Sequence, residues 1–382
     1  MMKPIRVGFI GLNSSQNVQY AGAWGLSAHL PYLKQSEHYT ITALCNSSQE
    51  SAVKAIQLHG LDADKVKAYG DPESLANDPN VDIVVCSVKV TEHYKLVRPA
   101  VLAAKSVFCE WPLASNLTQM KELARTAEQK KTQTIVGLQG RNGPYVQAIR
   151  KNIGDGGSRL GQVLSTSLVS YTYIFGMANP TDLAYMTEIK NGGNLFTISG
   201  IHLLDTITAA LGDIKSSNTI LRNKRPTIPL VDSSSHVVEA AHPNSGPEHI
   251  FVQGELKGDI PFSFQVRGGP QFKDTPAFDW RIYCQRGEIR VFGDNQLWLA
   301  PGVKLQVYDF ATQTVNEVDL QKFVEDNDKD DVAVRLGLQA PADNVARLYE
   351  AFAKGETEKY LDFKQSLKWA EFIQNAYIAN GF

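Results

Sequence analysis

Hydrophobic and polar residues follow two different rhythms along this chain, and the change comes near residue 140. In the first third, short apolar runs alternate with stretches in which apolar residues recur every three or four positions. The runs predict strands at 6–10, 39–44, 81–87, 106–109 and 134–138, and the periodic stretches predict helices at 49–59, 94–104 and 117–130. This alternation is typical of an α/β domain with a parallel sheet between two layers of helices.

After residue 140, polar and apolar residues alternate singly, as in strands with one covered face. The pattern predicts strands at 163–173, 249–255, 261–267, 277–284, 288–292 and 305–310, and helices at 195–211, 341–354 and 363–380. An acidic stretch at 325–331 is predicted to be a loop. We therefore expect two domains: residues 1–140, and residues 141–382 with an open, mostly antiparallel sheet and the C-terminal helices.

Composition excludes several classes of protein. The 382 residues include 38 Lys plus Arg and 40 Asp plus Glu, a net charge of -2, without a basic block that could follow a phosphate backbone. Direct nucleic-acid binding is not expected. Neither a signal peptide nor a membrane-spanning run is apparent, which predicts a cytoplasmic protein, or a nuclear one if it is a regulator. The four cysteines lack metal-ligand spacing, so reduced thiols and no metal site are expected.

The turn after the first strand is a candidate phosphate-binding site. It runs Gly11-Leu12-Asn13-Ser14-Ser15 and keeps only the first glycine of a dinucleotide fingerprint. Asn13 tolerates a positive φ, and the two serines offer hydroxyls for a pyrophosphate. A plain strand–turn–helix junction is the competing interpretation.

The end of the second strand bears on the choice of dinucleotide. Asn46 and Ser47 stand where an NAD binder usually has a carboxylate for the adenosine ribose, and no arginine adjoins them. Both NAD and NADP therefore remain open as cofactors. From these residues alone we expect their affinities to differ by less than about tenfold, or roughly 1.4 kcal/mol.

Several motifs occur in an order and at a spacing that resemble the glucose-fructose oxidoreductase and inositol dehydrogenase (Gfo/Idh/MocA) family. They are Val7-Gly-Phe-Ile-Gly-Leu, His93 after the Cys86-Ser87 strand end, Phe108-Cys-Glu-Trp-Pro-Leu-Ala, Gln139-Gly-Arg141 and Gly192-Gly-Asn-Leu-Phe-Thr-Ile-Ser-Gly-Ile-His202-Leu-Leu-Asp205. The resemblance implies a Rossmann domain, a nicotinamide cofactor, a small organic or sugar-like substrate, and at least a homodimer formed through the second sheet. It adds Ser87, His93, Glu110 and Trp111 to the expected cofactor-binding residues.

The same resemblance shows that the usual catalytic set is incomplete. The family's lysine maps to Trp111 within Glu-Trp-Pro, and its aspartate maps to Ile198, whereas its histidine is retained as His202. An indole offers one non-acidic N–H where an ammonium can move a proton. His202 and Lys89, which lies where the family has a proline, are the candidate catalytic residues. A core histidine and a solvated loop lysine are the alternatives.

The departures are shared with one branch of the family. Trp24–Pro31, Glu110-Trp111 and Leu138-Gln139-Gly140-Arg141 resemble the fungal galactose-regulon repressors and their oxidoreductase-like relatives. Two hypotheses follow: an oxidoreductase with an atypical site, or a non-catalytic, cofactor-binding regulator that binds a transcriptional-activator peptide. The retained His202 slightly favours the enzyme.

Overall fold

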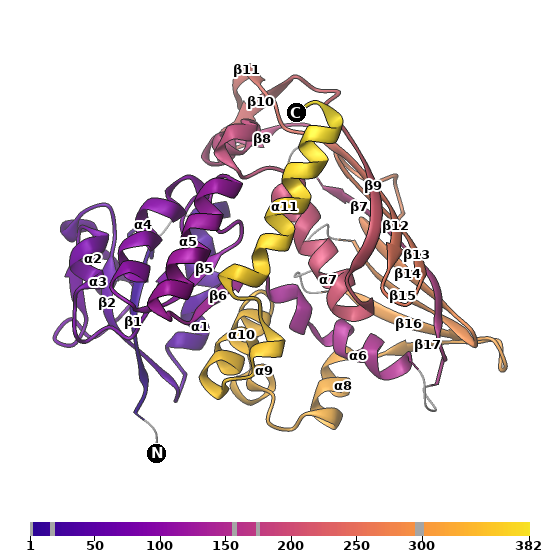
Figure 1. The fold of residues 1–382 in the computed structure, drawn as a ribbon, viewed down its shortest axis with the longest axis horizontal. Helices are drawn as coiled ribbons and strands as arrows, with labels where there is room; N and C mark the ends of the chain where they lie inside the picture. The colour runs from indigo at the N-terminus through magenta and orange to yellow at the C-terminus, as the bar shows by residue number, and fades with distance from the viewer. Residues whose placement is uncertain (1–2, 16–19, 155–158, 173–175, 295–301) are drawn as a thin grey trace. The chain divides into compact units, whose positions relative to one another are not determined.

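The computed structural model describes residues 3–15, 20–154, 159–172, 176–294 and 302–382 (Figure 1). The chain divides into two compact units. The first comprises Met1–Leu138, Lys190–Gly193 and Leu336–Phe372, and the second comprises Gln139–Ile189, Asn194–Arg335 and Ile373–Phe382.

Six parallel strands form the sheet of the first unit, in the order β3-β2-β1-β4-β5-β6. They are β1 (Ile5–Ile10), β2 (Tyr39–Cys45), β3 (Lys67–Tyr69), β4 (Ile83–Cys86), β5 (Ser106–Glu110) and β6 (Thr134–Gly137). The connecting helices include α2 (Gln49–Leu58), α3 (Pro72–Ala76), α4 (Val90–Leu102) and α5 (Leu117–Lys130). Every residue of β4 and β6 is buried, as expected of strands covered on both faces. This strand order is that of a Rossmann fold, and its winding reverses between β1 and β4, where such sheets bind ligands.

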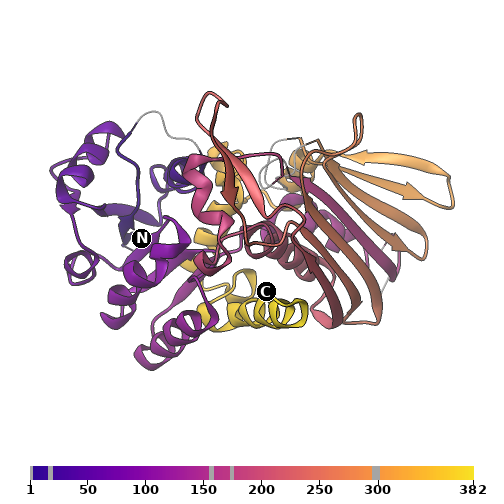
Figure 2. The same ribbon diagram turned by 90° about the horizontal axis from the view of Figure 1, so that it is seen from above.

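The second unit is built on an eight-stranded sheet in the order β17-β16-β15-β14-β7-β13-β12-β9. Its strands are β7 (Val163–Thr172), β9 (Ile214–Arg222), β12 (His249–Leu256), β13 (Ile260–Gly268), β14 (Phe278–Cys284), β15 (Gly287–Gly293), β16 (Lys304–Asp309) and β17 (Thr314–Val318). Only the β7–β13 pair is parallel among these described strands. Figure 2 shows the strands as one twisted layer.

One face of this sheet forms the core of the second unit. Helices α6 (Pro144–Asn152), α7 (Ile201–Leu211) and α8 (Leu320–Asn327) lie on that face (Figure 1). Trp280 of β14 is fully buried there, and its indole N–H donates to the Thr166 hydroxyl at 2.8 Å. Tyr145 of α6 meets the Trp280 ring edge-on at 6.5 Å between centroids.

The opposite face of the sheet carries the polar residues of the alternation. Arg290 pairs with Asp279 at 2.6 Å, and the Arg267 guanidinium lies 4.3 Å from the centre of the Tyr171 ring. A separate three-stranded sheet contains β8 (Asn179–Pro180), β10 (Thr227–Val231) and β11 (Val237–Pro243). No helix among the described residues is long and apolar enough to cross a membrane.

Most of the predicted architecture is confirmed. Each strand read from the sequence is present to within a few residues, although Tyr173 lies outside the described residues, and the second sheet is mostly antiparallel. The helix predicted at 195–211 consists of a π-helical turn, Phe196–Gly200, followed by α7. The prediction of a loop at 325–331 is wrong in part, because α8 continues to Asn327.

The C-terminal segment differs from the expected domain plan. Residues 336–372 belong to the first compact unit, whereas the sequence pattern predicted a second domain of residues 141–382. The physical reason is backbone pairing at the end of the first sheet: Val136 N–H donates to the Leu361 carbonyl at 2.9 Å, and Phe363 N–H donates to the Thr134 hydroxyl at 3.0 Å. Helix α10 (Ala342–Lys354) belongs to the first unit with this segment.

Candidate cofactor and active site

The predicted phosphate-binding turn begins where β1 ends, at the reversal point of the sheet. Gly11 has φ +98°, and a Cβ there would lie 2.3 Å from Val88 Cγ1 and 2.5 Å from the Ser87 carbonyl oxygen. Only glycine fits this conformation and this close approach to the loop after β4. Ser87, a predicted cofactor residue, is 5 % exposed and supports the turn from behind through its backbone.

Side chains hold the rest of the turn in place of the missing glycines. The Asn46 amide donates to the Leu12 carbonyl at 2.9 Å, and the His59 Nε2 lies 2.6 Å from the Asn13 carbonyl. Two further bonds, Ser15 N–H to Asn13 Oδ1 at 2.7 Å and the Ser14–Ser51 hydroxyl pair at 3.1 Å, complete the set. The turn is therefore preorganised without a full glycine fingerprint.

A cavity of about 760 Å³ opens beside this turn at the carboxyl ends of the strands. Six of the predicted cofactor residues line it: Gly11, Leu12, Asn13, Ser14, Asn46 and Ser47. Within the described ranges, the N–H groups of Leu12, Asn13 and Ser14 donate to no protein oxygen. Unused backbone donors at the end of a strand suit the oxygens of a pyrophosphate, so these residues fit a dinucleotide.

The far side of the cavity is acidic. Asp71, which caps the start of α3, Glu73 in the first turn of α3, and Glu92 of α4 line the same space as Lys95. Lys95 is the one cation among the described lining residues. Carboxylates are thus present at this cavity from the start of α3, although none follows β2.

Glu110 and Trp111 lie at the next strand end. Glu110 is the last residue of β5 and is 8 % exposed, with its Oε1 2.8 Å from His29 Nε2. Trp111 is 5 % exposed and precedes Pro112 through a cis peptide bond. Neither residue lines the 760 Å³ cavity. Both residues thus lie at the carboxyl end of the sheet, outside this cavity.

His93 connects the two loops that follow β4 and β5. Its Nδ1–H donates to the Pro112 carbonyl at 2.7 Å, its Nε2 lies 3.1 Å from the Val88 carbonyl, and it is 1 % exposed. Burial lowers the pKa of this imidazole, which favours the neutral ring. His93 therefore holds the loops after β4 and β5 in position. Any effect of His93 on a bound cofactor would be indirect, through the position of these loops.

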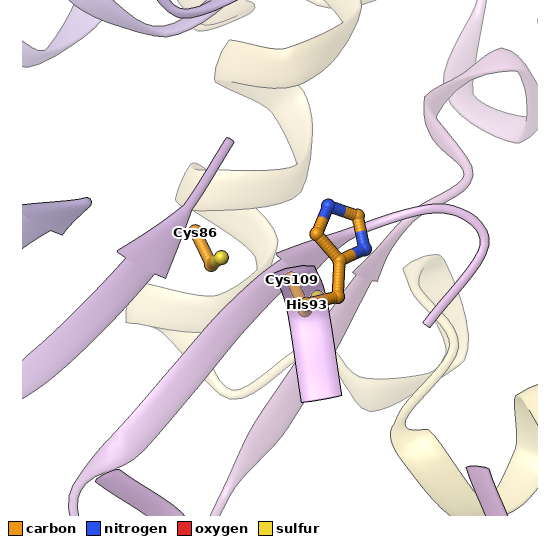
Figure 3. Close-up of side chains that lie close together, drawn as sticks. All are labelled: Cys86, His93 and Cys109. Carbon is orange, nitrogen blue, oxygen red and sulfur yellow. The ribbon is translucent and has the colours of Figure 1, made fainter. Parts of the chain in front are cut away.

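His93 also belongs to a buried cluster with Cys86 and Cys109 (Figure 3). One ligand atom from each lies within 4.8 Å of the others, which is close to the spacing of a metal site. However, both imidazole nitrogens face backbone carbonyls, and burial raises the pKa of the Cys109 thiol well above its usual range. A metal needs thiolates and a free imidazole nitrogen, so we assign these side chains to packing.

The two candidate catalytic residues lie in different compact units. Lys89 is exposed and immediately precedes α4 in the first unit. His202 is 7 % exposed in the first turn of α7 in the second unit, directly after the π-helical turn. Ile198, at the position of the family's aspartate, lies within that turn.

A buried ion pair fixes α7 within the second unit. Arg141 Nε and Nη2 donate to the two carboxylate oxygens of Asp205 at 3.1 and 3.0 Å, with side chains 10 % and 1 % exposed. Arg141 comes from the short helical segment Gln139–Asn142 and Asp205 from the turn of α7 after His202. The bidentate bond therefore sets the position of the helix that carries His202.

Comparison with known proteins decides the family. Residues 5–138 match the model described as an oxidoreductase family with an NAD-binding Rossmann fold, and residues 144–293 match that of the Gal80p C-terminal domain. Dehydrogenase aclE of Aspergillus oryzae is 31% identical over 328 residues, covering 85% of this chain and 87% of that protein. The chain belongs to the Gfo/Idh/MocA oxidoreductase family.

The family relatives include regulators as well as dehydrogenases. The galactose/lactose metabolism regulatory protein GAL80 of Saccharomyces cerevisiae is 30% identical over 302 residues, covering 76% of this chain and 67% of that protein. The crystal structure of a super-repressor mutant of Gal80p from the same yeast superposes with a TM-score of 0.82 at 25% identity, covering 99% of this chain and 96% of that one. The enzyme hypothesis and the regulator hypothesis thus each have a relative of about the same sequence identity, a dehydrogenase and a regulatory protein.

Several residues that line the cavity or hold the turn come from segments distant in sequence, and the sequence pattern did not indicate them. Asp71 and Glu73 follow the three-residue strand β3, which is too short to give a recognisable pattern. Ser51 in α2 and His59 directly after it hold the turn, and in the sequence both are ordinary polar positions of an amphipathic helix and its end. The capping sequence Asp71-Pro-Glu-Ser was the one local signal, because Asp71 accepts from Ser74 N–H at 2.7 Å.

Proposed function

We propose that this protein is an NAD-binding oxidoreductase for a small organic or sugar-like substrate, with Glu-Trp-Pro in place of the family's Glu-Lys-Pro. The observation that carries the proposal is the preorganised turn beside the 760 Å³ cavity, with its unused N–H donors. Gly11, Leu12, Asn13, Ser14 and Ser15 would hold the pyrophosphate, and Asn46 and Ser47 the adenosine ribose. When bound, the dinucleotide would supply the hydride acceptor or donor.

The nicotinamide end would be held by the strand ends further along the sheet. Ser87 and His93 keep the loop after β4 in place, and Glu110 and Trp111 offer a carboxylate and an apolar ring at the end of β5. We propose that His202 moves the substrate proton and that Lys89 supplies the positive charge that the family's lysine would otherwise provide. The role of His202 rests on the family resemblance and on its retention where the lysine and aspartate are lost.

The experiment that tests this function is a turnover screen of the purified chain. Alcohols and aldoses are incubated with the oxidised dinucleotide NAD+ and imines with its reduced form NADH, and the absorbance of the reduced nicotinamide is followed as it rises or falls. Turnover supports the enzyme. Dinucleotide binding without turnover on any class would favour the second candidate, a cofactor-binding regulator that recognises a transcriptional-activator peptide.

The regulator remains a candidate because of specific observations. The TM-score of 0.82 to Gal80p spans nearly the whole chain, and a tryptophan replaces the lysine expected at the catalytic position. A fluorescence-anisotropy titration with a labelled transcriptional-activator peptide, with and without NAD, would distinguish the two. NAD-dependent peptide binding supports the regulator, and its absence supports the enzyme.

The acidic wall of the cavity leads us to expect a preference for NAD. Asp71 and Glu73 line the cavity with negative charge, so the 2'-phosphate of a bound NADP would be repelled. NADP should bind roughly five- to tenfold more weakly than NAD at low ionic strength, with a smaller gap at high salt. Calorimetric titration with each cofactor measures the ratio.

A double variant provides the control for this preference. Asp71→Asn with Glu73→Gln keeps the helix cap and removes both charges, so the ratio should fall to within about twofold. A ratio that does not change in the double variant would contradict the assignment of the acidic wall.

We also propose that the chain forms at least a homodimer through the outer face of the eight-stranded sheet. Leu164, Tyr283 and Tyr308 are 43 %, 45 % and 37 % exposed on this sheet, around ion pairs such as Arg281–Glu288. A hollow of about 420 Å³ lies between Ser165, Ser263 and Tyr283. Light scattering at micromolar concentration should give twice the chain mass, and a monomeric mass would overturn this proposal.

A further inference from the structure

His29 is a buried histidine with a partner on each side of its ring. It is fully buried at the end of the π-helical segment Gly25–His29, directly before α1 (Leu30–Leu33). Its Nδ1 lies 2.8 Å from the Tyr349 hydroxyl, and its Nε2 lies 2.8 Å from Glu110 Oε1. All three residues belong to the first compact unit, although Tyr349 follows His29 by 320 positions.

The donors in this chain of hydrogen bonds follow from the Tyr349 phenol. Burial raises its pKa well above the usual range, so the phenol keeps its proton and can donate to Nδ1. The Glu110 carboxylate oxygen 2.8 Å from Nε2 accepts, which leaves Nδ1 as the acceptor for the phenol. The imidazole proton then sits on Nε2, from which it donates to Glu110. Tyr349 therefore selects the tautomer in which His29 can bind the carboxylate.

Tyr349 has little freedom to leave this position. Its ring packs against Phe108, Tyr32 and Tyr39, with centroids 4.9, 5.3 and 5.1 Å away. The Tyr39 hydroxyl donates to the Tyr349 carbonyl at 2.8 Å, which ties down helix α10 at the same residue. The hydroxyl that orients His29 is thus fixed by an aromatic cluster.

The Glu110 carboxylate is confined from its other side as well. Gly137 pairs with Glu110 across β5 and β6, and a Cβ on Gly137 would lie 2.3 Å from Glu110 Oε2. The carboxylate occupies the space that any side chain at position 137 would need. His29 and Gly137 together hold it in one orientation at the carboxyl end of the parallel sheet.

From this geometry we infer that His29 and Tyr349 are positioning residues for the cofactor, because they orient the Glu110 carboxylate and link its position to the C-terminal segment 336–372. The inference rests on the proposed binding of a nicotinamide dinucleotide beside Glu110. A carboxylate that is already oriented can accept ribose hydroxyls without losing side-chain entropy on binding. Neither residue needs to touch the cofactor.

The test compares two tyrosines of the same cluster. Tyr349→Phe removes the hydroxyl that orients His29, and Tyr39→Phe removes a hydroxyl that donates at the same 2.8 Å but only to the Tyr349 backbone. Calorimetry should show NAD affinity about three- to tenfold lower in Tyr349→Phe, the effect of one hydrogen bond, and unchanged within about twofold in Tyr39→Phe. The two variants should lose similar thermal stability.

A conservative replacement of His29 gives a second readout. His29→Gln keeps an N–H donor for Glu110 and should retain more NAD affinity than His29→Leu, which removes the donor. Equal losses of affinity in Tyr349→Phe and Tyr39→Phe, or no loss in either, would overturn the inference while leaving the proposed function intact. Absence of NAD binding by the natural chain would overturn both.

Discussion

Asp205→Ala should lower the free energy of unfolding by about 3–5 kcal/mol, because it leaves the Arg141 guanidinium buried without its counter-ion. The pair is bidentate and nearly inaccessible to solvent, so water cannot replace the lost carboxylate. Urea denaturation followed by tryptophan fluorescence measures the change.

Two further variants make the Asp205 result specific. Glu128→Ala breaks an exposed ion pair with Lys364 on the surface of α5 and should have little effect. Arg141→Met combined with Asp205→Leu removes both charges and should recover most of the lost stability. A loss in Asp205→Ala no larger than in Glu128→Ala would contradict the buried pair.

If the protein turns over a substrate, His202→Ala should lower kcat by about 100- to 10,000-fold, the range for a lost general acid–base group. NAD affinity should stay within about twofold, since the cavity that would hold most of the dinucleotide is formed by other residues. Steady-state kinetics on a substrate found in the turnover screen measures the first effect, and calorimetry measures the second.

His242→Ala is the matched control for His202. His242 lies in β11 and pairs with Glu239 at 3.0 Å, so its removal should leave both kcat and NAD affinity unchanged. Full activity of His202→Ala would show that another group moves the proton, and the assignment from the family resemblance would then be wrong.

The fold was predictable because its signals are local. Buried runs such as β4 and alternating strands such as β14 can be recognised within a few residues, and Gly11 marks a turn whose φ is positive. Likewise, the α5 boundaries follow from Asn116, which caps its start, and Lys131, which ends it in the left-handed conformation. Hydrophobic periodicity and helix caps each involve residues that are close together in the sequence, so they can be recognised without the structure.

The candidate site was predictable only in part, because much of it depends on contacts between distant segments. The pairing of His29 with Tyr349 joins positions 320 residues apart, and no local pattern distinguishes Tyr349 from any buried residue of an amphipathic helix. His93 reads as a cofactor ligand from its place in the family order, whereas its nitrogens face the Pro112 and Val88 carbonyls. Such roles appear only when the strand ends are brought together.

We expect the turn after β1, which side chains hold in place, to bind a nicotinamide dinucleotide although it lacks most of the glycine fingerprint. Calorimetric titration of the full chain with NAD up to millimolar concentration tests it most directly. We expect saturable binding of one NAD per chain, tighter than the binding of NADP. The absence of binding heat with either dinucleotide would contradict it.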